Sequence, residues 1–183
     1  MKFTPSKIPD VIIVEPDVFE DTRGWFTEFY NKKKYTEGGI TANFMQDNFS
    51  LSKTKGTLRA LHLQNAPFSQ AKLVYCTNGA VLDVAVDLRK NSPTYKQWVA
   101  IELSLENKKQ VFIPRGFAHG FLTLTDNTIF QYKVDNDYNK EAERTVRYND
   151  QDIGVIWGND NPLLIDRDKN APLLKDCDIN FGE

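Results

Sequence analysis

Short runs of apolar, β-branched and aromatic residues recur along the chain, each ending at glycine, proline, asparagine, aspartate or lysine. The clearest is residues 80–88, where valine and leucine at the even positions 82–88 alternate with residues that include Asp83 and Asp87. A period of two is typical of a β-strand with one drier face. Residues 72–76 form a second such run, and Asn78-Gly79 separates the two. Because Asn-Gly supplies the positive φ angles of a type I′ turn, the two runs predict a β-hairpin.

Many more strands are expected from the same pattern. They cover residues 8–14, 24–30, 43–50, 58–64, 98–103, 110–113, 117–124 and 128–133. Only residues 31–38 and parts of the chain after Asp150 have a helical pattern. Short strands with turn signals and no interleaved long helices favour an all-β antiparallel barrel or jelly roll over an α/β fold.

Length and charge limit the classes of function. The 183 residues suit a single domain over residues 1–183, because one barrel routinely reaches this size. The net charge is −2 and the basic residues are scattered, which argues against a nucleic-acid-binding face. No stretch reaches the roughly 20 apolar residues that cross a bilayer, and the polar amino terminus is unlike a signal peptide. We therefore expect a soluble cytoplasmic protein in which Cys76 and Cys177 are reduced structural thiols.

The chain has two histidines, His62 and His119, and each lies in a predicted strand. Imidazole titrates near neutrality, so His62, which lies near Arg59 and Gln64, is a candidate for proton transfer; the alternative is a hydrogen-bonded, half-buried histidine. A period of two places His62 and Arg59 on opposite faces unless a bulge intervenes. Catalytic metal sites usually need more histidine and carboxylate ligands than this pattern offers, so we expect no metal.

Other polar residues in the strands also have two interpretations. Lys72 opens an apolar strand and either extends to water or supplies a fixed positive charge. Tyr132 either belongs to the core or donates a proton into a cavity. Arg23 is either a solvated turn residue or a clamp for an anion. The charged residues 166–169, after an apolar triplet, usually indicate a solvated helix start.

Together these segments resemble the dTDP-4-dehydrorhamnose 3,5-epimerase family, which comprises cupin-type enzymes of deoxysugar biosynthesis. The resemblance covers nearly the whole chain. It rests on ordered motifs that include DTRG at residues 21–24, GTLRALHLQ at 56–64, DVAVDLR at 83–89 and GFAHGF at 116–121. It implies a cupin-like jelly-roll barrel with a few short peripheral helices.

The resemblance also implies an activity and a catalytic set. The family epimerises C3 and C5 of dTDP-4-dehydro-6-deoxy-D-glucose, which gives dTDP-4-dehydro-L-rhamnose for dTDP-L-rhamnose biosynthesis. Its general base corresponds to His62, the carboxylate that orients this base to Asp168, and its proton donor to Tyr132. The barrel lysine corresponds to Lys72, and no cofactor or metal is required.

Contacts with the dTDP-sugar, according to the same resemblance, fall on a larger set of residues: Phe19, Arg23, Phe26, Glu28, Gln46, Asn48, Arg59, His119, Tyr138, Glu143 and Arg167. The family is homodimeric, and its amino-terminal strands complete the neighbour's nucleotide pocket. Residues Arg23, Phe26 and Glu28 are accordingly expected to act in trans.

Two departures from the family pattern flank the expected base. Ala60 stands where the family usually has glycine, and Leu63 where it usually has an aromatic residue. The alternatives among enzymes are therefore one that epimerises C3 alone and a ketoisomerase acting on a related dTDP-4-keto-6-deoxyhexose. An alternative from a different class is a non-catalytic nucleotide-sugar-binding cupin, which would not need His62, Asp168 and Tyr132 together. A metal-dependent cupin is a further alternative, which the small number of histidines disfavours.

Overall fold

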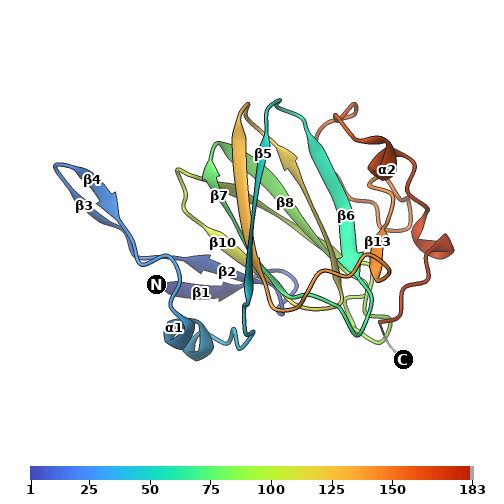
Figure 1. Cartoon of the computed structure of the whole chain (residues 1–183), viewed down its shortest axis with the longest axis horizontal. Helices are drawn as coiled ribbons and strands as arrows, with labels where there is room; N and C mark the ends of the chain where they lie inside the picture. The colour runs from blue at the N-terminus through green and yellow to red at the C-terminus, as the bar shows by residue number, and fades with distance from the viewer. Residues whose placement is uncertain (182–183) are drawn as a thin grey trace.

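Two antiparallel β-sheets face each other in the computed structural model, which describes residues 1–181 (Figure 1). The six-stranded sheet has the order β1 (Lys2–Pro5), β2 (Ile12–Glu15), β10 (Gln110–Ile113), β7 (Lys72–Asn78), β12 (Thr128–Val134) and β5 (Gln46–Ser52). The five-stranded sheet has the order β13 (Glu143–Thr145), β6 (Leu58–Gln64), β11 (Phe117–Thr123), β8 (Ala80–Asp87) and β9 (Trp98–Ser104). This is the all-β jelly-roll architecture that the sequence predicts.

Few other elements accompany the sheets. Strands β3 (Phe19–Asp21) and β4 (Gly24–Phe26) form a separate hairpin, here called the β3–β4 arm, which projects away from the barrel (Figure 1). The helices are α1 (Lys32–Glu37), α2 (Asp166–Lys169) and the 3₁₀ helix η1 (Leu174–Asp176). The Asn31 side chain accepts a hydrogen bond from the amide of Lys34 and caps α1, which confirms the helix expected over residues 31–38.

Buried apolar side chains form three clusters, one between the two sheets and one on the outer face of each sheet. The barrel interior holds residues of both sheets, among them Val74, Ala85 and Phe130. The carboxyl-terminal segment covers the outer face of the five-stranded sheet, where Trp157 packs in one cluster with Val84; this segment lies beside β6 and β13 in Figure 1. The third cluster, with Tyr35 of α1, covers part of the six-stranded sheet. Strand β8 is therefore buried on both faces, and its inner face carries Asp83.

The hairpin predicted at Asn78-Gly79 is wrong. Strand β7 pairs with β10 and β12, whereas β8 pairs with β11 and β9. The turn instead carries the chain from one sheet to the other. Only one of its two residues has a positive φ, namely Gly79 at 75°, whereas a type I′ turn needs two. A Cβ on Gly79 would lie 2.2 Å from Thr125 Oγ1, so this glycine also permits close packing at the corner.

Several strand boundaries differ from the sequence predictions. The strand expected over residues 24–30 ends at Phe26, because the carbonyl of Phe29 accepts hydrogen bonds from Tyr35 Oη (3.0 Å) and Gln110 Nε2 (2.6 Å) in place of a ladder. The strand expected over residues 8–14 is only β2. Strands β1, β3 and β13 were not predicted, since segments of only three or four residues carry little periodic signal.

A β-bulge interrupts the pairing of β6 with β11. His119 is opposite His62 and Phe121 is opposite Arg59, so Ala60 and Leu61 together face Gly120. The extra residue brings Arg59 and His62 to the same face although they are three positions apart. Gly120 makes this possible, because a Cβ there would lie 2.5 Å from the Ala60 Cβ and 2.8 Å from the Arg59 carbonyl oxygen.

We predict that Gly120→Ala disturbs the bulge and with it the position of His62. The added methyl group has no space, and such overpacking typically costs about 1–3 kcal/mol of unfolding free energy. Thermal denaturation should show the loss, and turnover should fall with it. Adding Ala60→Gly, which removes the nearest clashing atom, should restore part of both. Wild-type stability of the Gly120→Ala protein would refute this role of Gly120.

Candidate active site

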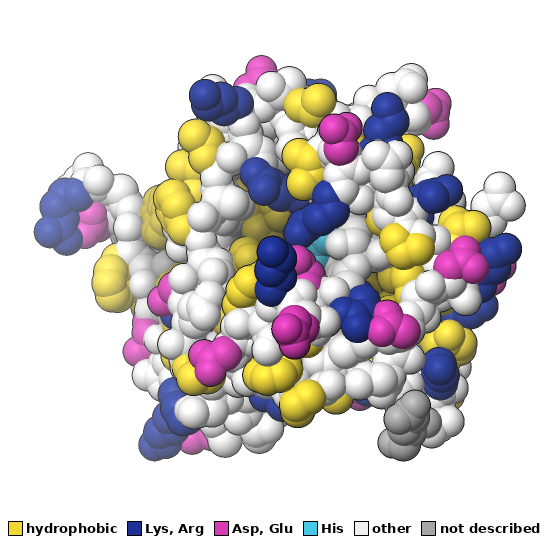
Figure 2. Space-filling view, turned by 45° about the vertical axis from the view of Figure 1, so that its right-hand side comes forward, with side chains coloured by type: hydrophobic (Ala, Val, Ile, Leu, Met, Phe, Trp, Pro, Cys, Tyr) yellow, Lys and Arg dark blue, Asp and Glu magenta, His cyan; other side chains and the backbone are white. Residues whose placement is uncertain are grey.

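A cavity of about 250 Å³ opens between the two sheets at one end of the barrel. A hollow on this face holds a histidine bordered by basic and acidic side chains (Figure 2). Both sheets, the loop between β6 and β7, the loop before β13 and helix α2 contribute side chains to the lining: Ser50, Arg59, His62, Leu63, Gln64, Gln70, Lys72, His119, Phe121, Tyr132, Tyr138, Glu143 and Arg167. Eight of the residues expected to act at the site are therefore in this one cavity.

His62 forms a hydrogen bond with Asp168, a residue 106 positions later in the chain. The distance from His62 Nε2 to Asp168 Oδ1 is 2.9 Å, and the Asp168 side chain is 1% exposed. The short helix α2 presents this carboxylate to the interior, although the local charge pattern of residues 166–169 alone indicates a solvated helix start. Burial opposes its ionisation, but the hydrogen bond with His62 and the charges of His62 and Arg167 outweigh this effect and lower the Asp168 pKa below its ordinary value.

The ionised carboxylate selects one tautomer of His62. A carboxylate only accepts hydrogen bonds, so we assign the proton to Nε2, which donates it to Asp168. The Nδ1 atom then carries the lone pair and is the nitrogen able to take a proton from a ligand. The backbone amide of Ala60 also donates to Asp168 Oδ2 at 3.4 Å, which ties the carboxylate to the bulge.

Arg167 and Glu143 extend this arrangement to the rim of the cavity. Arg167 Nε lies 3.3 Å from Asp168 Oδ1, and its Nη1 donates to Glu143 Oε1 at 3.0 Å. The other Glu143 oxygen accepts a hydrogen bond from the Tyr138 hydroxyl at 3.2 Å. Polar contacts therefore connect the exposed Tyr138 with the pair formed by the half-buried His62 and the buried Asp168.

Lys72 and Tyr132 lie on the six-stranded sheet, across the cavity from His62. Lys72 Nζ is 5.8 Å from the centre of the Tyr132 ring. Burial lowers the pKa of Lys72 to about 8, although the charges of Asp83 and Glu143 counteract it. Burial raises the pKa of Tyr132, and the charge of Arg59 opposes this rise. At neutral pH both groups keep their protons, so the site offers a cation and a phenol donor.

His119 forms a second, deeper pair with an aspartate. Its Nε2 lies 2.7 Å from Asp83 Oδ1, and both side chains are almost fully buried. Burial lowers the pKa of His119 in spite of the Asp83 charge, so a neutral imidazole lines the cavity. Sequence reasoning did not assign a role to Asp83, although a charged residue on an alternating strand was a usable signal.

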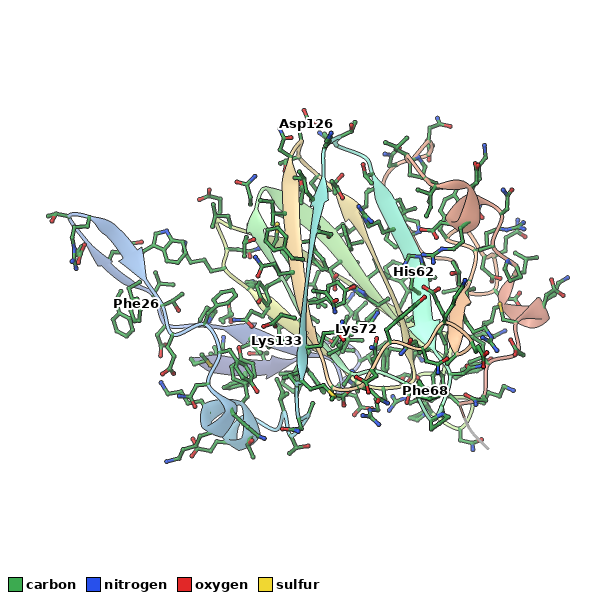
Figure 3. All side chains as sticks on the ribbon, in the orientation of Figure 1. Phe26, His62, Phe68, Lys72, Asp126 and Lys133 are labelled. Carbon is green, nitrogen blue, oxygen red and sulfur yellow. The ribbon has the colours of Figure 1, made fainter. Side chains whose placement is uncertain are left out.

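The other predicted substrate contacts lie outside this cavity. Phe19, Arg23 and Phe26 are on the exposed β3–β4 arm, and Figure 3 shows Phe26 far from His62 and Lys72. The Arg23 guanidinium pairs with Asp21 at 2.6 Å. Of the remaining three predicted contacts, Glu28 pairs with Lys34 at 2.7 Å, while Gln46 donates a hydrogen bond to Asn48 on β5.

Sequence reasoning also missed some of the cavity lining. Ser50, Gln70 and Phe121 were not assigned to the site. Phe121 is the last residue of the GFAHGF motif and shares a face with His119, so strand periodicity could have indicated it. Gln70 lies in a loop without a periodic signal.

Residues 1–181 contain neither a cluster of metal ligands nor a membrane-spanning helix. These residues include no group of three His, Cys, Asp or Glu side chains arranged to hold a metal ion. None of the helices in the same span has the length and apolar character to cross a membrane.

Comparisons with known proteins give the same family over almost the full length of this chain. The family model for dTDP-4-dehydrorhamnose 3,5-epimerase matches residues 5–176. A Shigella flexneri protein of that name is 50% identical over 97% of this chain and 98% of its own. The crystal structure of dTDP-4-dehydrorhamnose 3,5-epimerase from Elizabethkingia anophelis has 50% identity and a TM-score of 0.91, with 96% of this chain and 97% of that chain covered.

A third similar protein was solved with a bound sugar nucleotide. It is the dTDP-6-deoxy-D-glucose-3,5-epimerase of Legionella pneumophila in complex with dTDP-4-keto-L-rhamnose, with 43% identity and a TM-score of 0.92 over 97% of this chain and 94% of that chain. The shared fold is the cupin-like jelly roll that the sequence resemblance implied. This chain, with the His62–Asp168 pair in its barrel, belongs to the dTDP-4-dehydrorhamnose 3,5-epimerase family.

Proposed function

We propose that this enzyme epimerises C3 and C5 of dTDP-4-dehydro-6-deoxy-D-glucose and so forms dTDP-4-dehydro-L-rhamnose for dTDP-L-rhamnose biosynthesis. The observation that carries the proposal is one cavity holding the His62–Asp168 pair, Lys72 and Tyr132. Two relatives with 50% identity, both named dTDP-4-dehydrorhamnose 3,5-epimerase, support the substrate.

Proton removal falls to His62. A hydrogen on a carbon next to a ketone is acidic enough for a positioned imidazole to abstract. Asp168 holds the proton of His62 on Nε2, which leaves Nδ1 as the base, and its negative charge stabilises the imidazolium that forms.

Proton removal leaves an enolate with negative charge on the C4 oxygen. A cation close to this oxygen stabilises the enolate. Lys72 supplies an ammonium group in a largely buried position, and Arg59 lies at the same cavity. A fixed cation in a water-poor site stabilises developing charge by a few kcal/mol more than it would in water. We assign Lys72, assisted by Arg59, to the C4 oxygen.

Inversion needs a proton from the face opposite the base. His62 comes from the five-stranded sheet and Tyr132 from the six-stranded sheet, so a sugar ring in the cavity has one on each side. The pKa of Tyr132 is raised, and a protonated phenol can return the proton that completes inversion.

The rim of the cavity offers two groups suited to the nucleotide part of the substrate, Arg167 and Tyr138. Arg167 has a forked guanidinium suited to a diphosphate, and the exposed Tyr138 ring offers a flat surface to the thymine base. Of the two rim groups, Arg167 directly contacts the catalytic pair, so phosphate binding and base orientation share one residue.

We also propose that the enzyme is a homodimer in which the β3–β4 arm completes the neighbour's site. The arm exposes Phe26 (68%) and Trp25 (48%), and the edge strand β5 exposes Phe49 (67%). Exposed aromatic residues beside an open sheet edge favour pairing with another chain. Arg23 lies outside its own cavity, as expected for a residue that acts in trans.

The two cysteines support a cytoplasmic location. Cys76 is buried, Cys177 is half-buried, and both are free thiols. Because disulfides are rare in cytosolic proteins, the free thiols support a cytoplasmic location, which we propose for this enzyme.

His62→Ala and Tyr132→Phe are predicted to fail in different ways. Without its base the His62→Ala enzyme should exchange neither the C3 nor the C5 hydrogen in deuterated water. Tyr132→Phe should still exchange hydrogen while inversion is lost, because only the opposite-face donor is missing. Proton NMR of the dTDP-sugar measures both outcomes.

The matched control for this experiment is Tyr95→Phe, which removes a phenol outside the cavity and should leave both reactions unchanged. Epimerisation by the His62→Ala enzyme at the wild-type rate would end the assignment of the base. Wild-type exchange at C3 alone would favour the C3-specific alternative.

Lys72 is predicted to be needed for activity at a cost in stability. Its lowered pKa means that the unfolded chain holds this proton up to a higher pH than the folded protein. Stability should therefore rise with pH from about 8 towards the ordinary value of 10.5. Lys72→Met should raise the unfolding free energy at neutral pH by up to about 3 kcal/mol and lower kcat/KM about a hundredfold or more.

Lys133 on neighbouring β12 provides the control, because it pairs with Asp47 outside the cavity. Lys133→Met should change neither kcat/KM nor stability by a comparable amount. In the wild-type enzyme kcat/KM should fall above about pH 8 as Lys72 loses its proton. A Lys72→Met protein that is less stable than wild type at neutral pH yet fully active would contradict both expectations.

The shared site predicts complementation between inactive subunits. Arg23→Ala leaves the barrel site intact and His62→Ala leaves the arm intact, so a heterodimer has one complete site. Random mixing should restore about a quarter of the wild-type activity, because about half of the dimers are mixed and each has one site of two. A monomer in light scattering, or no recovery after verified subunit exchange, would exclude the shared site.

A further inference from the structure

Two loops border the cavity beside Tyr138, and one buried side chain connects them. The first loop, residues 65–71, follows β6, and the second, residues 135–142, precedes β13. Gln64, the last residue of β6, is 5% exposed and lines the cavity. Its Nε2 donates hydrogen bonds to the carbonyls of Phe68 (2.7 Å) and Asp137 (3.0 Å), and its Oε1 accepts one from the amide of Asn139 (2.7 Å).

The bonded residues of the second loop flank Tyr138 on both sides. Gln64 therefore fixes the backbone immediately before and immediately after this residue. The Tyr138 side chain is 59% exposed, and its hydroxyl makes a 3.2 Å contact with Glu143. An exposed contact of this length holds a ring weakly, so the direction of the ring depends mainly on the backbone that Gln64 holds.

The same strand carries the proposed base. Gln64 follows His62 by two positions on β6, and both line the cavity. Residues i and i+2 of a strand point to the same side. A rigid strand therefore sets the distance between the base and the Tyr138 platform, with the amide of Gln64 as the connecting group.

We propose that Gln64 is a positioning residue that holds Tyr138 in register with His62 and thereby sets where a thymidine diphosphate lies relative to the base. The inference rests on the proposed function, because it assigns Tyr138 to the nucleotide. Gln64 acts through Tyr138 and touches no reacting atom.

Other amides tie the same loops together without flanking Tyr138. Gln70 Nε2 donates to the Asn136 carbonyl at 2.8 Å, and Asn136 Nδ2 donates to the Pro67 carbonyl at 3.0 Å. These bonds keep the loops folded when Gln64 is changed. Loss of the Gln64 amide should therefore displace Tyr138 without unfolding the rim.

The test is dTDP binding measured by calorimetry for Gln64→Met, a change of similar size that removes all three hydrogen bonds. We expect about tenfold weaker binding in the wild-type background and less than a twofold effect in the Tyr138→Ala background, because residues that act as one unit are non-additive. Gln131→Met is the matched control. Gln131 bonds to Thr77 on the outer side of the sheet at 3.1 Å, and its loss should leave dTDP affinity unchanged.

Steady-state kinetics separate positioning from a general loss of structure. For Gln64→Met the KM for the dTDP-sugar should rise about tenfold while kcat stays within about twofold of wild type, because the residues that move protons are untouched. If Gln64→Met does not fold, Gln64→Glu replaces it. A glutamate keeps the acceptor for Asn139 but places a carboxylate against two carbonyl oxygens, so the same result is expected.

Hydrogen exchange of the ligand-free proteins reports on the loop itself. The Asn139 amide should lose protection in Gln64→Met and keep it in Gln131→Met. Wild-type dTDP affinity in Gln64→Met, an equal loss in the Tyr138→Ala background, or unchanged protection of Asn139 would each overturn the proposal. Failure of the wild-type protein to bind dTDP would instead overturn the proposed function, and the exchange data would still decide whether Gln64 holds the loop.

Discussion

The contact of Gly120 with the bulge in β6 determines the geometry of the whole site. A regular strand would turn Arg59 and His62 to opposite faces, and the one extra residue turns both into the barrel. The same bulge places the Ala60 amide near Asp168, so the backbone irregularity also holds the carboxylate that orients the base. Packing in this small region therefore has a direct consequence for proton transfer.

The buried charge of Lys72 serves the proposed reaction but lowers the stability of the fold. Lys72 is kept in a position where burial lowers its pKa, which is unfavourable for folding. The nearby carboxylates of Asp83 and Glu143 compensate in part. Each carboxylate also has a second partner, His119 for Asp83 and Arg167 for Glu143. The charge of Lys72 is thus coupled through Glu143 to Arg167 at the rim, and Arg167 contacts Asp168, the partner of the base His62.

Strand periodicity predicted the β-rich class and most strands, because strands buried on one or both faces leave a clear apolar pattern. It did not predict pairing. The Asn78-Gly79 turn looked like a hairpin, but pairing partners depend on contacts far along the chain. The helical residue Asp168 was assigned through family resemblance, since its local sequence resembles a solvated helix start. Strand periodicity could name a bulge between Arg59 and His62 only as a condition and could not decide it, because the bulge depends on the small size of Gly120 on another strand.

The tautomer of His62 tests the central claim most directly, because the proposed chemistry requires Nδ1 to be unprotonated. Long-range proton–nitrogen NMR correlation of histidine-labelled protein at mildly alkaline pH distinguishes the two ring nitrogens. We predict a proton on Nε2 of His62 and a bare Nδ1 in the wild-type protein, and loss of this preference in Asp168→Asn. A proton on Nδ1 of wild-type His62 would contradict the account.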